Sequence, residues 1–434
     1  MNLYKNTFII AFFTIISQAL GVLRDKLLIS IVGVGALLDI YNASFKIPDL
    51  IMAIFVSFVG ITIVVPFLTS SLVKNDKAEF EKKLASLFVF FNGAMTLFSI
   101  IIILTLDLFL HKLFPAFSAE NLATLSHLSK IMLIQPIMLG ISNLLVCVAQ
   151  TYKNFLYYAM APVFYNAGII IGIIFFYKNY GVYGLAYGVL LGALMHLFIN
   201  SIFIFKNKID INLVYFNFSY IKNIAPTALW RSAAFIILSL KQFIITIFAG
   251  FLGVGVISVF TFATNLVNMA VQFFATSYSV ASFPILSEYF EKGENEKLKK
   301  EVKKNTIEIF VFSILFCVLA FVFAPFIVKI IYNDNKQVLE LFYILILAIP
   351  FLNLEQYYAR AMMAMHRVKL ITMIQVFSFA ILCVSLTYFY KMGYDYTFLA
   401  KAYLMSSISQ VILLVILSRL DFLKKNKLEI KNSN

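Results

Sequence analysis

The chain has 434 residues, of which 62% are hydrophobic and 13% are charged, and its mean hydropathy is +0.92. Soluble domains are about 45–50% apolar and about 25% charged, so this composition excludes them and indicates a protein that crosses a membrane several times. The net charge of +14 does not indicate a nucleic-acid partner, because no segment is long and polar enough to form a basic face on a soluble domain.

The hydrophobic runs predict the membrane spans. A helix needs about 20 mostly apolar residues to cross a bilayer. Runs of that kind predict twelve spans, at 6–32, 36–72, 85–110, 126–150, 157–177, 181–205, 222–250, 254–286, 304–332, 337–365, 369–390 and 395–420. We do not interpret the first run as a cleaved signal peptide, because no small-residue cleavage site follows and the run continues into "LRDK".

The segments between the spans predict the topology. With the N-terminus in the cytoplasm, most of the Lys and Arg residues outside the spans fall on the cytoplasmic side, as the positive-inside rule requires. The basic segments 291–304 and 424–431 are then solvated orientation signals. We therefore expect a multi-pass protein of the bacterial cytoplasmic (inner) membrane with both termini in the cytoplasm.

An internal repeat organises the spans. Gly33-Val34-Gly35 precedes a long helix that reaches Pro66 and a charged linker, and Gly253-Val254-Gly255 precedes a helix that reaches Pro284 and a second charged linker. Each copy begins after an even number of crossings, so the repeats are parallel. The expected fold is all-α and polytopic, with twelve transmembrane helices in two six-helix lobes, 1–210 and 211–434, forming a V around a central cavity. The second lobe ends in a short basic cytoplasmic tail.

The second span carries a polar stripe. Asp39, Asn42, Lys46 and Asp49 recur at steps of three and four, which places them on one helical face. Pro48 cannot donate a backbone hydrogen bond, so it predicts a kink near Ser44 and, together with Gly33 and Gly35, a hinge. Alternatively, Asp39 and Lys26 lie at the outer surface and Lys46 alone is deep and extends its chain toward water.

Ionisable residues in other spans suggest what the cavity binds. Arg24 and Asp25 are adjacent and point about 100° apart, so we expect Arg24 in the cavity and Asp25 as a counter-charge toward a neighbouring helix, to Lys46 or Lys26. Arg231 and Lys241 are ten residues apart and line one wall at two depths. The excess of cations predicts an anionic, phosphorylated substrate.

No enzymatic chemistry is indicated. The sequence contains no G-x-x-x-x-G-K-[ST] phosphate loop, G-x-S-x-G elbow or H-E-x-x-H pair. Its three cysteines lie in apolar runs without metal-binding spacing. We expect no enzyme, no metal site and no cofactor.

The stretch "SQALGVLRDKLLISIVGVGALLDIYNASFKIPDL" at 17–50 resembles the N-terminal signature of the lipid II flippase (MurJ-type) family. That family belongs to the multidrug/oligosaccharidyl-lipid/polysaccharide (MOP) exporter superfamily. The same superfamily contains the Wzx-type polysaccharide flippases and the MATE-type drug exporters. The matching positions are Ser17, Leu20, Gly21, Arg24, Asp25, Gly33, Gly35, Asp39, Phe45, Lys46, Pro48, Asp49 and Leu50. Residues 114–136 are similar to the family's outer loop and fourth helix, with Lys130 at its basic position.

The chain departs from this family at several positions. Residues that differ from the family's charged ones are Gln18, Met52, Ala53, Ser57 and Asn265. Two further C-terminal helices that line a lipid groove in the family are not matched. The resemblance implies the scaffold more strongly than the identity of the saccharide.

The resemblance implies a flippase for an undecaprenyl-pyrophosphate-linked saccharide, either lipid II or a related lipid-linked oligosaccharide. It would move this substrate from the cytoplasmic to the periplasmic leaflet by alternating access. The product would serve peptidoglycan or cell-surface polysaccharide biosynthesis. Arg24 and Lys46 would bind the pyrophosphate, with Arg231 or Lys241 closing from the second lobe. The membrane potential or a Na⁺ or H⁺ gradient would drive transport, with Asp25 or Asp39 as candidate ion ligands. We expect a monomer among membrane lipids. The alternatives are a MATE-type exporter of small molecules and a non-transporting membrane scaffold.

Overall fold

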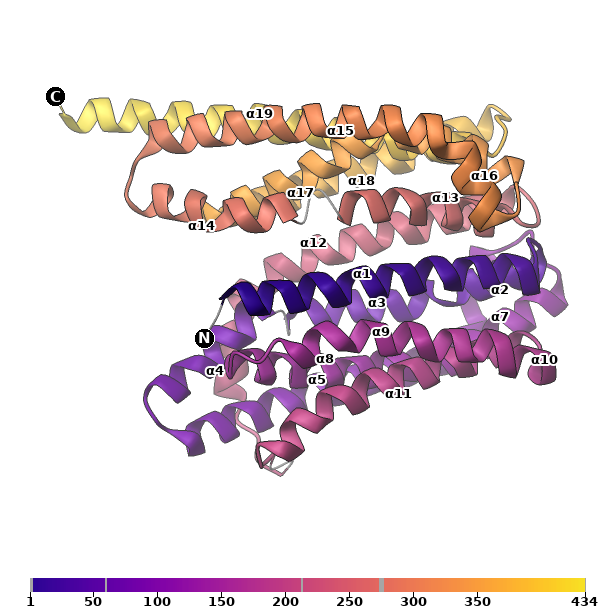
Figure 1. The fold of residues 1–434 in the computed structure, drawn as a ribbon, viewed down its shortest axis with the longest axis horizontal. Coiled ribbons are helices and arrows are strands. Elements are labelled where there is room, and N and C mark those ends of the chain that lie inside the picture. The colour runs from indigo at the N-terminus through magenta and orange to yellow at the C-terminus, as the bar shows by residue number, and fades with distance from the viewer. Residues whose placement is uncertain (1–2, 59–60, 212–213, 273–276, 434) are drawn as a thin grey trace. The chain divides into compact units, whose positions relative to one another are not determined.

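The computed structural model describes residues 3–58, 61–211, 214–272 and 277–433, and helices dominate these ranges (Figure 1). The chain divides into two compact units, Met1–Ser258 and Val259–Asn434. The first unit extends beyond the expected lobe boundary at residue 210, because the helix that follows this boundary packs against the third helix of the same unit.

Among its described residues, the first unit contains fifteen helical elements in chain order, the last of which begins in it and continues into the second unit. They are α1 (Leu3–Leu27), η1 (Leu28–Val32), α2 (Ala36–Ser44), α3 (Lys46–Phe58), α4 (Ile61–Val73), α5 (Lys77–Thr105), α6 (Asp107–Leu113), α7 (Ala119–Met132), α8 (Ile134–Thr151), α9 (Leu156–Ile171), η2 (Gly172–Phe176), α10 (Tyr177–Tyr180), α11 (Val182–Lys206), α12 (Phe218–Phe251) and α13 (Val256–Val271). The elements η1 and η2 are single π-helical turns.

The described part of the second unit contains six more helices, which are α14 (Ser277–Glu291), α15 (Asn295–Tyr332), α16 (Lys336–Ile346), α17 (Ile349–Ala364), α18 (Val368–Lys391) and α19 (Phe398–Ser433). Helices α14, α15 and α17 share an apolar core around Tyr357 and Met362, both fully buried. Helices α18 and α19 are joined by Ser378 and Ser406, each of which donates its hydroxyl to the other's carbonyl oxygen at 2.9 Å.

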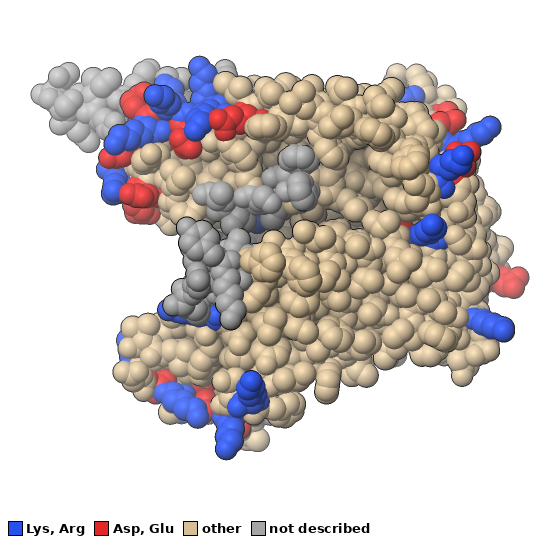
Figure 2. All heavy atoms as spheres, viewed as in Figure 1, with Lys and Arg blue, Asp and Glu red and all other residues tan. Residues whose placement is uncertain are grey.

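The helices account for the expected membrane spans. Within the described residues, nine helices or continuous helix pairs are long and apolar enough to cross a membrane, and α16 with α17, bent by 52°, makes a tenth. The runs at 36–72 and 254–286 are built from shorter helices, α2–α4 and α13–α14. On the face drawn in Figure 2, charged side chains gather at the helix ends and leave an uncharged surface along the middle of each unit, as a bilayer requires. The predicted all-helical membrane fold is confirmed.

Helices α1, α9 and α11 lie side by side in the first unit (Figure 1). The backbones of α9 and α11 approach closely because glycines face each other across the contact, Gly168 against Gly192 and Gly172 against Gly188, where a Cβ atom on either partner would clash. In lipid, no hydrophobic effect drives helices together, so small residues at such crossings stabilise the contact by letting the backbones approach and form van der Waals contacts. This contact fixes the position of α9, which reaches the candidate site below.

Candidate functional site

Arg24 near the end of α1 is the centre of the candidate site. Its guanidinium forms an ion pair with Asp25 at 2.8 Å, and Nη1 donates to Oδ1 of Asn166 on α9 at 3.4 Å. The Asp25 side chain is 5% exposed and that of Arg24 is 26% exposed. The site therefore combines a buried carboxylate with an accessible cation.

This geometry corrects the expectation for Asp25. We expected its counter-charge on Lys46 or Lys26, because adjacent helical residues point about 100° apart. The arginine side chain is long and flexible, so its fork turns back to reach the neighbouring carboxylate and donates from both Nε and Nη2 to Oδ1. Asp25 thus neutralises Arg24 directly.

Lys46 and Asp49 lie on the open face of α3. Lys46 is half-buried and Asp49 is exposed, whereas Ile47, Ile51 and Phe55 on the opposite face are buried. Lys46 and Asp49 interact through their charges, and the Lys46 ammonium group has no hydrogen bond or ion pair within 4.0 Å among the described residues. The face therefore presents one cation that is not tied into the protein by a direct contact.

Two tyrosines connect α3 with Arg24. Tyr165 of α9 lies within electrostatic range of both Arg24 and Asp49, and Tyr41 of α2 lies within range of Arg24. The hydroxyl of Tyr165 accepts a hydrogen bond from Gln135 at 2.9 Å. The sequence patterns do not single out Asn166 or Tyr165; a lone asparagine inside the apolar run 157–177 was the available signal.

The break expected near Ser44 is present. Helix α2 ends at Ser44, Phe45 forms a turn, and α3 begins at Lys46. Pro48 has no N–H to donate to the carbonyl of Ser44, so the helical ladder is interrupted there. That Pro48, Gly33 and Gly35 act as a hinge stays a prediction.

Asp39 has a structural role that the sequence analysis did not predict. Its carboxylate accepts hydrogen bonds from the N–H of Gly255 at 2.5 Å, the N–H of Ser258 at 2.8 Å and the hydroxyl of Ser258 at 2.6 Å. Asn42 donates to the same hydroxyl oxygen at 3.2 Å. Asp39 thereby caps the N-terminus of α13, where free N–H groups and the helix dipole favour a negative charge.

The cap gives Asp39 and Asn42 a structural role within the polar stripe. Asp39 is 1% exposed and Asn42 is buried, and both are bonded to the start of α13, although Asp39 also borders the small cavity described below. The role of Asp39 as a ligand for a coupling cation stays a prediction. The polar stripe therefore divides at Phe45 into a closed half and an open half.

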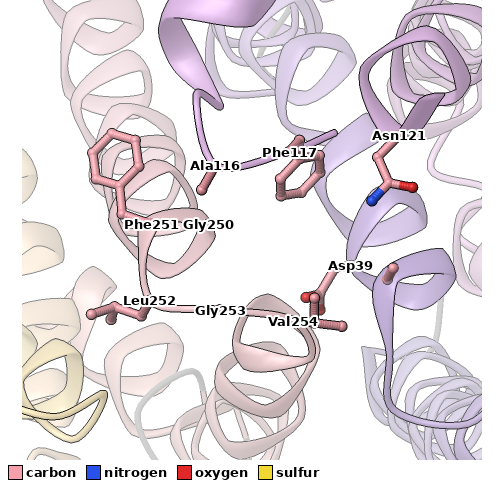
Figure 3. A pocket seen from close by; sticks show the side chains of 10 residues that line it. Asp39, Ala116, Phe117, Asn121, Gly250, Phe251, Leu252, Gly253 and Val254 are labelled. Atoms are coloured by element: carbon pink, nitrogen blue, oxygen red, sulfur yellow. The ribbon is translucent and has the colours of Figure 1, made fainter. Parts of the chain in front are cut away.

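A small cavity lies beside the cap (Figure 3). It has a volume of about 170 Å³ and is lined mostly by apolar side chains and by backbone of the 250–254 segment, with Asn121 and Asp39 as its polar members. Gly255 adopts φ +92°, and a Cβ atom there would lie 2.8 Å from Cγ1 of Val34. The two glycine loops of the internal repeat thus touch, and Gly33 also has a positive φ of +80°.

The two cations expected on the seventh span are placed differently. The side chain of Arg231 lies outside the described residues. Lys241 is on α12, which packs against α3, and is 5% exposed. Lys241 therefore does not offer the accessible ammonium group that we expected, and Arg24 and Lys46 are the predicted cations that the structure leaves accessible. Among the described side chains, no group of His, Cys, Asp and Glu is arranged to hold a metal ion.

Comparison with known proteins places the chain in a family. The probable lipid II flippase MurJ of Buchnera aphidicola subsp. Acyrthosiphon pisum (strain APS) is 28% identical over 320 residues, which is 70% of this chain and 60% of that relative. A solved lipid II flippase MurJ in an inward closed conformation superposes with a TM-score of 0.77 at 21% identity, covering 96% of this chain and 90% of that one.

A multidrug resistance MATE family transporter of the MOP superfamily, in an inward-facing conformation, superposes with a TM-score of 0.79 at 16% identity over 94% of this chain and 96% of that one. These two likenesses establish the shared fold. The family model for the lipid II flippase MurJ matches residues 28–433, nearly the whole chain. This protein therefore belongs to the lipid II flippase MurJ family.

Proposed function

We propose that this protein is a flippase for an undecaprenyl-pyrophosphate-linked saccharide, moving it from the cytoplasmic to the periplasmic leaflet for peptidoglycan or cell-surface polysaccharide synthesis. One observation carries the proposal beyond family membership: two accessible cations, Arg24 and Lys46, lie in spans of a membrane protein. An ionisable group inside a span costs about 2.5–3.5 kcal/mol on insertion scales, so such groups mark binding sites or ion paths.

The chemistry of these cations fits a pyrophosphate. A guanidinium provides planar paired donors that match phosphate oxygens, and the ammonium group of Lys46 adds a mobile point charge. Asp25 and Asp49 offset the charges of the two cations, and the N–H groups of Arg24 that Asp25 does not take remain for the phosphate oxygens of a dianionic headgroup. The prenyl chain stays in the apolar surroundings that the uncharged surface of the helices provides.

The charge that the substrate or a coupling ion carries across the membrane determines how much energy the membrane potential can supply. One elementary charge crossing 100 mV is worth about 2.3 kcal/mol, enough to bias an alternating-access cycle. We propose the membrane potential or a Na⁺ or H⁺ gradient as the driving force, with Asp25 or Asp49 as the candidate carboxylates. We also propose a monomer in the bacterial inner membrane, with both termini in the cytoplasm and no nucleic-acid partner.

The test combines lipid analysis with matched variants. Mass spectrometry of lipids that co-purify under mild extraction should recover an undecaprenyl-pyrophosphate-linked glycan from the wild type. The yield should fall in Arg24→Lys, which keeps the charge and loses the paired donors, and in Lys46→Ala. Lys26→Ala is the matched control, because Lys26 is an exposed cation two residues from Arg24.

The variants also separate this function from the alternatives. Replacement of the chromosomal flippase by these variants should block growth for Arg24→Lys and Lys46→Ala at unchanged membrane levels, while Lys26→Ala grows normally. Normal growth of all three variants would point to a scaffold role. Efflux of cationic drugs that is lost in Asp49→Asn and kept in Lys46→Ala would point to a MATE-type exporter, and either result would overturn the proposal.

A further inference from the structure

We infer that Asn166 on α9 is a positioning residue that orients the Arg24 guanidinium for an anionic headgroup. This inference rests on the proposed function for its biological meaning, although its geometry stands by itself. Asn166 is neutral and half-buried, and it lies between two polar residues of α1.

The hydrogen bonds around Asn166 fix the orientation of its amide. Nδ2 lies 3.2 Å from the carbonyl oxygen of Ser17 and 3.1 Å from its hydroxyl oxygen. A carbonyl oxygen can only accept, so the NH₂ group must face Ser17. Oδ1 is consequently turned toward Arg24 and accepts from Nη1 at 3.4 Å.

Ser17 and Arg24 can share this partner because of their spacing on α1. Seven residues are close to two helical turns, so the two side chains lie on one face, with Gly21 between them. A Cβ atom at Gly21 would meet nothing within 4 Å. The missing side chain leaves open space on the face that carries Arg24, next to the donors that a ligand would use.

The close contact of α9 with α11 determines where Asn166 points. A Cβ atom at Gly192 would clash with the carbonyl oxygen of Tyr165, and one at Gly168 would clash with the backbone of Gly192. On the other side, the hydroxyl of Tyr165 accepts from Gln135 of α8. Residues directly before and shortly after Asn166 are thus held by neighbouring helices, and rotation of α9 is restricted.

Two anchors on one guanidinium perform different tasks. Asp25 accepts from Nε and Nη2, and Asn166 accepts from Nη1, which leaves one N–H on each terminal nitrogen without a partner among the described residues. Asp25 neutralises the cation, whereas Asn166 holds its plane without adding charge. A neutral anchor preserves the attraction to phosphate that a second carboxylate would cancel.

The first experiment measures the orientation without any ligand. Phenylglyoxal modifies accessible guanidinium groups, and peptide mass spectrometry gives the rate at Arg24 in purified wild type, Asn166→Leu and Asn92→Leu. Asn92 is a matched control, because it is a membrane-helix asparagine whose amide bonds to Phe88 of its own helix. We expect about a threefold faster modification of Arg24 in Asn166→Leu, as for loss of a weak hydrogen bond to a charged group, and no change in Asn92→Leu.

The second experiment is a double-mutant cycle for binding of undecaprenyl pyrophosphate to protein in nanodiscs. Asn166→Leu should weaken binding about tenfold in the wild type and have no further effect in Arg24→Lys, since residues that act as a unit are not additive. Additive losses, or unchanged phenylglyoxal labelling in Asn166→Leu, would overturn the positioning role. Faster labelling combined with no lipid binding by the wild type would instead support the positioning role and overturn the proposed function.

Discussion

The two halves of one polar stripe differ in what their charges do. Asp39 and Asn42 on α2 are buried and bonded to the start of α13, whereas Lys46 and Asp49 on α3 remain accessible. The break at Phe45 separates them. Residues with the same helical spacing and the same resemblance to a family motif therefore serve stability on one side of the break and, by our proposal, binding on the other.

Replacing Asp39 tests the closed half most severely. Asp39→Leu leaves the N–H groups of Gly255 and Ser258 buried without an acceptor, and we expect a loss of about 3 kcal/mol in the free energy of unfolding. Asp39→Asn keeps one acceptor and should lose less. Thermal unfolding in detergent measures the difference, and an Asp39→Leu protein as stable as the wild type would show that the cap is dispensable.

Lys46 tests the open half. Lys46→Ala should weaken binding of undecaprenyl pyrophosphate about tenfold, as loss of a charge-assisted hydrogen bond to phosphate predicts, with little change in thermal stability. Asp49→Asn should strengthen binding about threefold by removing the neighbouring negative charge. Lys26→Ala serves as the control. A stability loss in Lys46→Ala as large as in Asp39→Leu would remove the distinction between the halves.

Asn42 sharpens the comparison because it shares a partner with Asp39. Asn42→Ala removes a hydrogen bond to the Ser258 hydroxyl and should cost about 1 kcal/mol of stability. Combined with Asp39→Leu, its effect should be smaller than alone, because both residues act on Ser258. Full additivity in thermal unfolding would indicate that the two contacts are independent.

Much of the fold follows from the sequence because it depends on local patterns. Apolar run lengths predict the spans, and Pro48 predicts the break at Phe45 from its missing donor. The cap on α13 could not be predicted, since Asp39 and Ser258 are 219 residues apart and a cap requires the folded arrangement of both segments. The same holds for Asn166, whose partners on α1 are more than 140 residues away.

For the candidate site, the sequence indicates the types of residue more clearly than the contacts that these residues form. Arg24 and Lys46 are partly exposed, and their role in binding stays a prediction. The pairing of Arg24 with its own neighbour depends on the rotamer of a long side chain, which spacing does not determine. Lys241 has a helical position compatible with a cavity wall, yet the packing of α12 on α3 buries it. Periodicity specifies which residues share a face and leaves open what covers that face.

A smaller effect comes from a carboxylate that lies just beyond the apolar helix Lys77–Thr105. Asp107 at the start of α6 accepts hydrogen bonds from Lys130, at 2.6 Å, and from Ser126, and these contacts lower the pKa of the Asp107 carboxyl below its ordinary value. A lowered pKa in the folded protein means that the contribution to stability is present above the unfolded pKa, about 3.9, and is lost as pH falls through the folded value.

The Asp107 side chain is 61% exposed, so the contribution of the pair is small. We expect Asp107→Asn to lower the midpoint of thermal unfolding by no more than about 2 °C at pH 7, and the difference from wild type to be lost as the pH falls through the lowered pKa of the folded Asp107 carboxyl. High salt should reduce the difference at pH 7 as well, because exposed charges are screened.

The hydrogen bonds of Asp39 are buried, in contrast to those of Asp107, so salt should leave the effect of Asp39→Leu on thermal unfolding unchanged. Equal salt dependence of the two variants would contradict the burial of the Asp39 cap.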